Sequence, residues 1–234
     1  MKPRIEVVAL DCLMVRLFDE IAESNMPWML AASENLRAAF AGQLIDLVPS
    51  YTTLMVHYDL NALSPAQARE LIGEALIDLS PNTRSSGQCH VLPVWYDLSV
   101  GPELDLLAKR STLTVDEVIR RHSEREYQVF ALGFAPGFAF MGLVEEALAA
   151  PRLNTPRKKV AAGSVGIAER QTAAYPAVSP GGWNLIGRTP ARLFDRDREG
   201  YSLMQPGDTV RFAAISHAEF INLGGDDTPL EVQA

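Results

Sequence analysis

The first 80 residues alternate between strand-like runs and a helix-like spacing of hydrophobic positions. Apolar runs at residues 5–10 and 13–17 predict a pair of strands, and runs at 44–48 and 53–58 predict two more. Between the pairs, hydrophobic side chains recur every three or four residues, which predicts a helix; these positions are Met29, Ala32, Leu36 and Phe40.

A second helix is indicated by a capping box. Ser64 and Gln67 have the spacing in which each side chain caps the other's backbone amide, and Pro65 suits the first helical position. This helix is expected to run to about Leu79. Strand, helix, strand, strand, helix and a possible closing strand is the ferredoxin-like order. We therefore predict a small α+β domain, a ferredoxin-like α/β sandwich, over residues 1–84.

A polar gap at residues 80–87 follows and indicates a domain boundary, which we place between residues 84 and 85. In the second region, 85–234, a β run at 90–96 precedes two short helices at 102–109 and 115–123. Short strands punctuated by glycine and proline come next, ending in a strand at 209–215. This pattern is typical of a β-barrel or sandwich. The tail after Ile221 is expected to be frayed.

The composition is that of an ordinary globular protein, with 47% hydrophobic and 21% charged residues. A net charge of −8 and the lack of a basic patch beyond residues 157–159 argue against nucleic-acid binding. No apolar run is long enough for a membrane span, and the N-terminus does not resemble a signal peptide.

Cysteine and histidine usage narrows the chemistry further. Cys12 and Cys89 form no CxxC motif, so we expect two buried thiols in a reducing, cytoplasmic setting. The four histidines show no metal-ligand spacing, so we expect no metal site. His122 ends a predicted helix, where a positive charge is favoured, which indicates a structural role.

Half of the 16 glycines lie between Gly133 and Gly187, interleaved with aromatic residues. Glycine permits positive φ and close backbone approach, so this stretch predicts tightly turned β structure with exposed amides lining a cleft. Two segments offer runs of backbone N–H groups that can bind anions, although on spacing alone a plain β-turn is the favoured interpretation of each. The first comprises Gly163, Ser164, Val165 and Gly166, and the second comprises Pro180, Gly181, Gly182 and Trp183.

Three polar side chains in this stretch are candidate catalytic residues. Arg188, restrained by neighbouring glycine and proline, suits bidentate recognition of a carboxylate or phosphate. The alternative is a surface arginine paired with Asp195 or Asp197. Gln171 and Tyr175 either orient an amide substrate or serve turns. Two aromatic residues are expected to pack in the barrel with ring edges in the cleft, namely Phe138 and Trp183.

Four segments together resemble one family. They are LGFAPGFAFMG at 132–142, AAGSVGIAERQTAAYP at 161–176, SPGGWNLIGRTPARLFD at 179–195 and QPGDTVRF at 205–212. In this order and spacing they resemble allophanate hydrolase subunit 1, a family also known as the B subunit of 5-oxoprolinase and as that of a sporulation-kinase inhibitor. One departure is the pair Glu169 and Arg170, which stands where the family usually has glycines.

The resemblance implies a cyclophilin-like β-barrel after the N-terminal domain and a carboxyltransferase-type domain. It also implies pairing with a sister C-type subunit, related to allophanate hydrolase subunit 2, and with a third, lactam-hydrolysing subunit. Such assemblies use ATP to open 5-oxoproline to glutamate, so the expected substrate is a small amide or lactam. The chain alone is expected to be inactive, because it has no P-loop and no evident nucleophile–base pair.

Two alternatives use the same barrel, because a fold does not decide a function. The first is a regulatory binding module that inhibits a sensor histidine kinase. The second, prolyl isomerisation, rests on the cyclophilin-like fold alone.

Overall fold

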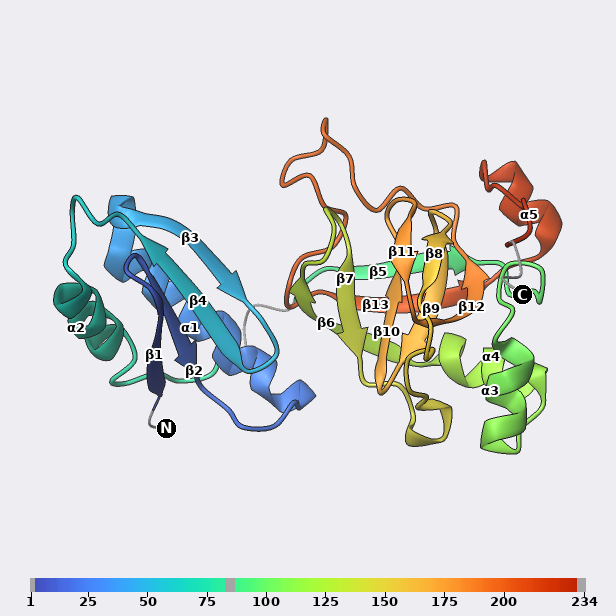
Figure 1. Cartoon of the computed structure of the whole chain (residues 1–234), viewed down its shortest axis with the longest axis horizontal. Coiled ribbons are helices and arrows are strands. Elements are labelled where there is room, and N and C mark those ends of the chain that lie inside the picture. Colours follow the sequence, from blue (N-terminus) through green and yellow to red (C-terminus); the bar gives the residue numbers. More distant parts are fainter. Residues whose placement is uncertain (1–2, 83–86, 231–234) are drawn as a thin grey trace. The chain divides into compact units, whose positions relative to one another are not determined.

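The computed structural model describes residues 3–82 and 87–230, and the chain divides into two compact units, Met1–Ser86 and Gly87–Ala234 (Figure 1). The predicted boundary between residues 84 and 85 lies outside the described residues. Each unit has its own sheets and its own hydrophobic core.

The N-terminal unit is a four-stranded antiparallel sheet with helices, in the sheet order β1-β2-β4-β3. Helix α1 packs on β3 and β4, and α2 packs on α1 (Figure 1). The core between them consists of apolar side chains that are fully buried, including Leu13, Val15, Leu36, Phe40, Leu54 and Val56. The elements are β1 Arg4–Ala9, β2 Cys12–Arg16, α1 Met26–Phe40, β3 Leu44–Pro49, β4 Thr53–Tyr58 and α2 Pro65–Ala75, with short 3₁₀ turns at Glu23–Asn25 and Ala41–Gln43.

This arrangement matches the predicted strands and helices with one difference at the sheet edge. Helix α2 begins at its predicted capping box, in which Ser64 and Gln67 cap each other, but it ends at Ala75. Residues 76–82 form no strand, so the expected closing strand is absent from the described part of this unit. Strand β1 pairs with β2 and occupies the edge where that strand would lie.

The C-terminal unit is built on a seven-stranded sheet with the order β12-β9-β10-β7-β6-β13-β5. Its two edges meet where the backbones of Trp95, just after β5, and Arg188 exchange two hydrogen bonds of 2.9 Å, which closes the barrel. A separate two-stranded sheet pairs β8 with β11. The strands are β5 Cys89–Val94, β6 Glu126–Leu132, β7 Ala139–Gly142, β8 Arg157–Val160, β9 Ser164–Ala168, β10 Gln171–Ala174, β11 Ser179–Gly181, β12 Asn184–Arg188 and β13 Thr209–Ala214.

Three helices accompany the barrel. Helices α3, Leu104–Ser111, and α4, Val115–Glu124, pack against each other, and α4 also packs on β13 (Figure 1). Helix α5, His217–Asn222, follows β13 and begins with a capping box between Ser216 and Glu219. A 3₁₀ turn at Glu146–Leu148 lies between β7 and β8. The predicted α+β chain with a ferredoxin-like first domain and a cyclophilin-like barrel is thus confirmed, except that β1 takes the place of the expected closing strand.

His122 is fully buried between α4 and the barrel, where its ring stacks on Phe212 at a centroid distance of 4.6 Å. Its Nδ1 accepts a hydrogen bond from the Tyr96 hydroxyl at 2.8 Å, and its Nε2 lies 2.9 Å from Thr172 Oγ1. Because Thr172 donates its own proton to the Gly166 carbonyl, Nε2 of the imidazole carries the hydrogen. Burial lowers the pKa of His122 to about 3. The residue is structural as predicted, but it is neutral rather than positively charged.

We expect the fragment 87–234 to fold without the rest of the chain, because its core is contained within it. The purified fragment should show a single cooperative urea transition by circular dichroism and dispersed NMR amide signals. A gradual, non-cooperative loss of signal would contradict an independent barrel domain.

Candidate functional site

Two pockets in the C-terminal unit take lining residues from the segments around the β8–β11 sheet. One contains Arg188 and the other is lined by aromatic rings. Lys159 of β8 and Val178, just before β11, line the first, whereas Pro180 and Gly181 of β11 line the second. Of the predicted site residues, Arg188 lines the first pocket and six others line the second, so the set does not form one cleft.

Arg188 is positioned by the closure of the barrel. It is the last residue of β12, and its paired hydrogen bonds with Trp95 fix its backbone. Gly187 allows this approach, since a Cβ there would lie 2.7 Å from the Trp95 carbonyl oxygen. The backbone of Arg188 is thus fixed at the point where the two edges of the sheet meet.

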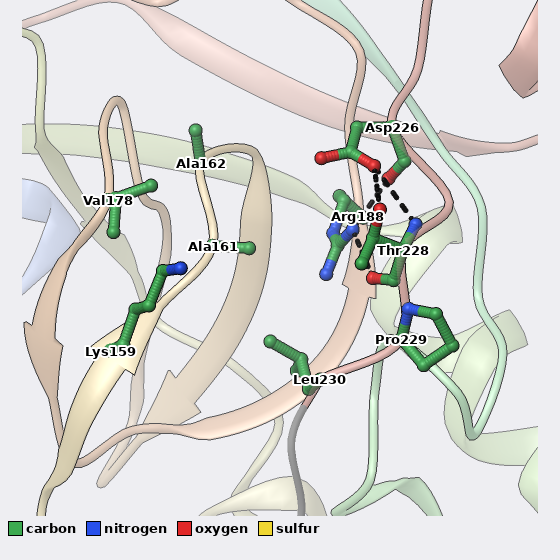
Figure 2. Close-up of a pocket in the computed structure, with 9 residues that line it drawn as sticks. All are labelled: Lys159, Ala161, Ala162, Val178, Arg188, Asp226, Thr228, Pro229 and Leu230. Carbon is green, nitrogen blue, oxygen red and sulfur yellow. Dashed lines mark hydrogen bonds between the residues drawn. The ribbon is translucent and has the colours of Figure 1, made fainter.

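The Arg188 cavity, which we define by its nine lining residues, has a volume of about 260 Å³. Figure 2 shows the Arg188 side chain on one side of this space and Lys159 with Val178 across from it. The wall combines two cationic side chains and the carboxylate of Asp226 with Thr228 and small or apolar residues. The lining residues are Lys159, Ala161, Ala162, Val178, Arg188, Asp226, Thr228, Pro229 and Leu230.

A C-terminal strap, residues 226–230, forms one wall of the cavity. Arg188 Nη1 donates to the backbone carbonyls of Asp226 at 2.6 Å and Thr228 at 2.8 Å (Figure 2). The Leu230 amide donates to the Ser99 carbonyl, which ties down the far end of the strap. The prediction that the tail after Ile221 is frayed is wrong for the described residues, because the strap is bonded to Arg188 and Ser99. Residues 231–234 lie outside the described residues.

Arg188 is only 1% exposed, which rules out the alternative of a surface arginine. Asp195 instead lies 3.1 Å from Arg192 in an ion pair. Within the described residues, Nε and Nη2 of Arg188 are buried and have no hydrogen-bond partner. Burial lowers the pKa of Arg188 below its ordinary value, and the carboxylates of Asp226 and Asp227 act in the opposite direction. An arginine still remains charged in such surroundings.

The second pocket, which we call the aromatic pocket, has a volume of about 80 Å³. Tyr175 is buried against Gly181, whose missing side chain makes room for the phenol: a Cβ there would lie 2.3 Å from the tyrosine oxygen. Burial raises the pKa of Tyr175, so the phenol is neutral at physiological pH. The pocket brings together six of the predicted residues with three others, and its lining is Phe134, Phe138, Phe140, Arg152, Tyr175, Pro180, Gly181, Gly182 and Trp183.

The first predicted anion nest is wrong, because its amides are used within the protein. Gly163 N–H donates to the Tyr175 carbonyl at 2.7 Å, and Ser164 N–H donates to the Ala161 carbonyl at 3.3 Å. Val165 and Gly166 lie in β9, in register with strands on both sides. Gly163 has a φ of +79° and packs on Thr189, so it serves a turn beside Arg188.

The predicted set and the observed pockets differ at several other positions. Gln171 starts β10 opposite Gly142 and lines neither pocket. Cys89 is exposed, so the prediction of two buried thiols holds only for Cys12. The sequence did not identify Lys159 as a site residue, although the basic run at 157–159 could have indicated it.

Two kinds of feature are absent from the described residues. No helix in the ranges 3–82 and 87–230 is long and apolar enough to cross a membrane. Over the same ranges, no three His, Cys, Asp or Glu side chains are grouped so that they could hold a metal ion.

Comparison with known proteins places the chain in a family. Residues 3–204 match the model of the carboxyltransferase domain, subdomains C and D. The chain belongs to this family. The B subunit of 5-oxoprolinase from Bacillus subtilis strain 168 is 35% identical over 227 residues, which cover 93% of this chain and 95% of the relative.

Solved structures agree with this assignment. The crystal structure of TTHA0988 superposes with a TM-score of 0.77 at 36% identity over 89% of this chain. The match spans only 40% of TTHA0988, so that protein is much longer. Kluyveromyces lactis urea carboxylase matches 93% of this chain with a TM-score of 0.72, and this chain covers 22% of it. At 15% identity the latter likeness shows the fold alone.

Proposed function

We propose that this chain is a non-autonomous subunit of an ATP-dependent hydrolase that opens 5-oxoproline, a cyclic amide, to glutamate. Its partners are a sister subunit of the C type and a third, lactam-hydrolysing subunit. The proposal is supported by relatives that carry the name of the B subunit of 5-oxoprolinase, one of which aligns over 95% of its own length. The setting we propose is the cytoplasm.

The observation that carries the proposal is the cationic character of the Arg188 cavity. 5-Oxoproline carries a carboxylate, and cationic side chains, arginine above all, bind this group through charge-assisted hydrogen bonds. The cavity offers Arg188 and Lys159 and one carboxylate, that of Asp226, but no histidine or cysteine among its lining residues. Its one hydroxyl, that of Thr228, donates to the Asp226 carboxylate at 2.6 Å. The cavity therefore suits binding of the acid, while activation of the amide, proton transfer and nucleophilic attack require groups from other subunits.

ATP is the co-substrate of the proposed reaction, and we place its binding with the partner subunits. The chain has neither the GxxxxGK[ST] nor the GxGxxG pattern that cradles phosphates. The glycine amides of the predicted nest at 163–164 are already bonded within the protein. The described residues thus offer no phosphate cradle of the predicted kind.

A second candidate function, inhibition of a sensor histidine kinase, is favoured by one feature of the aromatic pocket. Phe134 is 64% exposed and has a positive φ of 68°, which is rare for a bulky side chain. Its ring stands edge-on to Phe138 and Tyr175. This exposed ring is available for contact with a partner protein, which in this second function is the kinase.

We expect the purified chain alone to show no ATP-dependent opening of 5-oxoproline. Mixed with the sister and third subunits, it should copurify with them and support glutamate formation. The measurement is glutamate release from 5-oxoproline with and without ATP. Robust turnover by the isolated chain would overturn the non-autonomous role. If no mixture forms glutamate and the chain binds a histidine kinase tightly, the regulatory function is favoured.

A further inference from the structure

Within the described residues, the guanidinium group of Arg188 forms hydrogen bonds through only one of its three nitrogens. The Nη1 nitrogen is satisfied by two carbonyls of the C-terminal strap. The Nε and Nη2 nitrogens have no partner among the described residues, and both are buried. These two nitrogens lie on the same edge of the planar group, which is the edge that binds the two oxygens of a carboxylate. A buried charged donor without a partner is costly, so this edge points to a ligand.

The nearest acidic side chains are already engaged elsewhere. The Asp226 carboxylate accepts hydrogen bonds from the amide and hydroxyl of Thr228. The Asp227 carboxylate lies 2.9 Å from Nε2 of His217, at the start of α5. Among the described residues, neither carboxylate accepts a hydrogen bond from the open edge of Arg188. The strap thus shields the arginine with backbone carbonyls and leaves its Nε–Nη2 edge without an acceptor among the described residues.

The remainder of the cavity suits a small ring. Ala161, Ala162 and Val178 line the wall that also carries Lys159, and Leu230 lines the strap side (Figure 2). The volume of about 260 Å³ accommodates a five-membered ring with one carboxylate. Lys159 supplies a second cation from an exposed position on β8.

We propose that the Arg188 cavity binds the carboxylate of a small cyclic acid through Nε and Nη2 of Arg188, with Lys159 as the second cation. The ring of the acid packs on the small apolar residues, and the C-terminal strap moves aside to admit it. This inference rests on the proposed function in one respect, which is that the acid in the cell is 5-oxoproline. Its carboxylate is then anchored in this chain, and its lactam is presented to the partner subunits.

The test is isothermal titration of the isolated full chain with three probes of similar size. These are 5-oxoproline, cyclopentanecarboxylate, which keeps the ring and the carboxylate, and 2-pyrrolidinone, which keeps the lactam and lacks the carboxylate. We expect both acids to bind, and 2-pyrrolidinone to bind at least tenfold more weakly. Inorganic phosphate serves as a fourth probe, and binding of phosphate in preference to both acids would overturn the proposal.

Two neighbouring lysines provide a matched pair of variants that leaves the core intact. Lys158 and Lys159 are both exposed on β8, but only Lys159 lines the cavity. Lys159→Gln should weaken binding of both acids about three- to tenfold, since it removes one charge-assisted contact. Lys158→Gln should leave binding unchanged. Equal effects of the two variants, or none from either, would contradict the assignment.

A third variant tests the arginine itself. Arg188→Lys keeps a charge but loses the planar fork, so it should weaken both acids by more than tenfold. Circular dichroism establishes whether this variant of a buried residue folds. If it does not fold, the comparison of Lys159→Gln with Lys158→Gln remains as the test. Failure of all acids to bind the wild-type chain would overturn the site and leave the proposed function standing. If the acids bind but no assembly of subunits turns over 5-oxoproline, the proposed function is overturned and the binding site in the Arg188 cavity stands.

Discussion

Glu103→Ala should destabilise the barrel domain by about 3–5 kcal/mol, the cost of leaving a buried charge without its partner. Glu103 pairs with Arg157 of β8, and the two side chains are only 10% and 13% exposed. Its second carboxylate oxygen accepts the Leu185 amide of β12 at 2.8 Å. One residue at the start of α3 therefore ties two strands together, and its removal leaves both the guanidinium and the amide without this acceptor.

The measurement is urea unfolding of the full chain, with hydrogen exchange of β12 peptides as a local readout. Asp105→Ala is the matched control, because it breaks the exposed pair with Lys109 on the same helix. Such exposed pairs contribute about 0–1 kcal/mol. A loss below about 1 kcal/mol for Glu103→Ala, comparable to the control, would show that the buried pair does not hold the strands together.

Acidification should destabilise the barrel domain through His122. Burial lowers the pKa of this imidazole to about 3, whereas an unfolded histidine titrates near its ordinary value of about 6.5. Between these values the unfolded state binds more protons, so stability is full above about pH 6.5 and falls as the pH drops. The total effect by pH 3 is on the order of 4–5 kcal/mol, at about 1.4 kcal/mol for each pH unit.

The contribution of His122 can be isolated by comparing variants across this pH range. The groups that face the ring are the hydroxyls of Tyr96 and Thr172 and the aromatic faces of Tyr127 and Phe212. None of them titrates in this range, since burial raises the pKa of both tyrosines. His122→Gln should be less stable at pH 7 but should show a flatter loss of stability toward acid. An unchanged slope in His122→Gln would contradict the account.

Local patterns are sufficient to predict most of the secondary structure. The capping box at Ser64 and the helical spacing from Met29 to Phe40 are signals that lie within one element. The closing strand, by contrast, is predicted only from the usual order of elements. Whether a sheet edge is free for a closing strand depends on which other strand pairs there. In the N-terminal unit, β1 pairs with β2 and fills that edge. A local hydrophobic pattern does not show which of two distant segments will pair at one sheet edge.

The candidate site is predictable only in part for the same reason. The glycines and aromatic residues of 133–183 indicate a pocket, and six predicted residues line one. The nest at 163–166 fails because local sequence does not distinguish a turn amide from one paired in a sheet. The sequence points to Arg188 as an anion ligand, but its burial depends on carbonyls 38 and 40 residues away. A polar tail alone gives no reason to expect that contact.

The most direct test of the proposed function is a reconstitution with one component left out. Glutamate formed from 5-oxoproline and ATP is measured for the sister and third subunits, first without this chain and then with increasing amounts of it. We predict that turnover depends on this chain and saturates when it matches its sister in amount. Equal turnover in its absence would contradict the proposal that it is part of the enzyme.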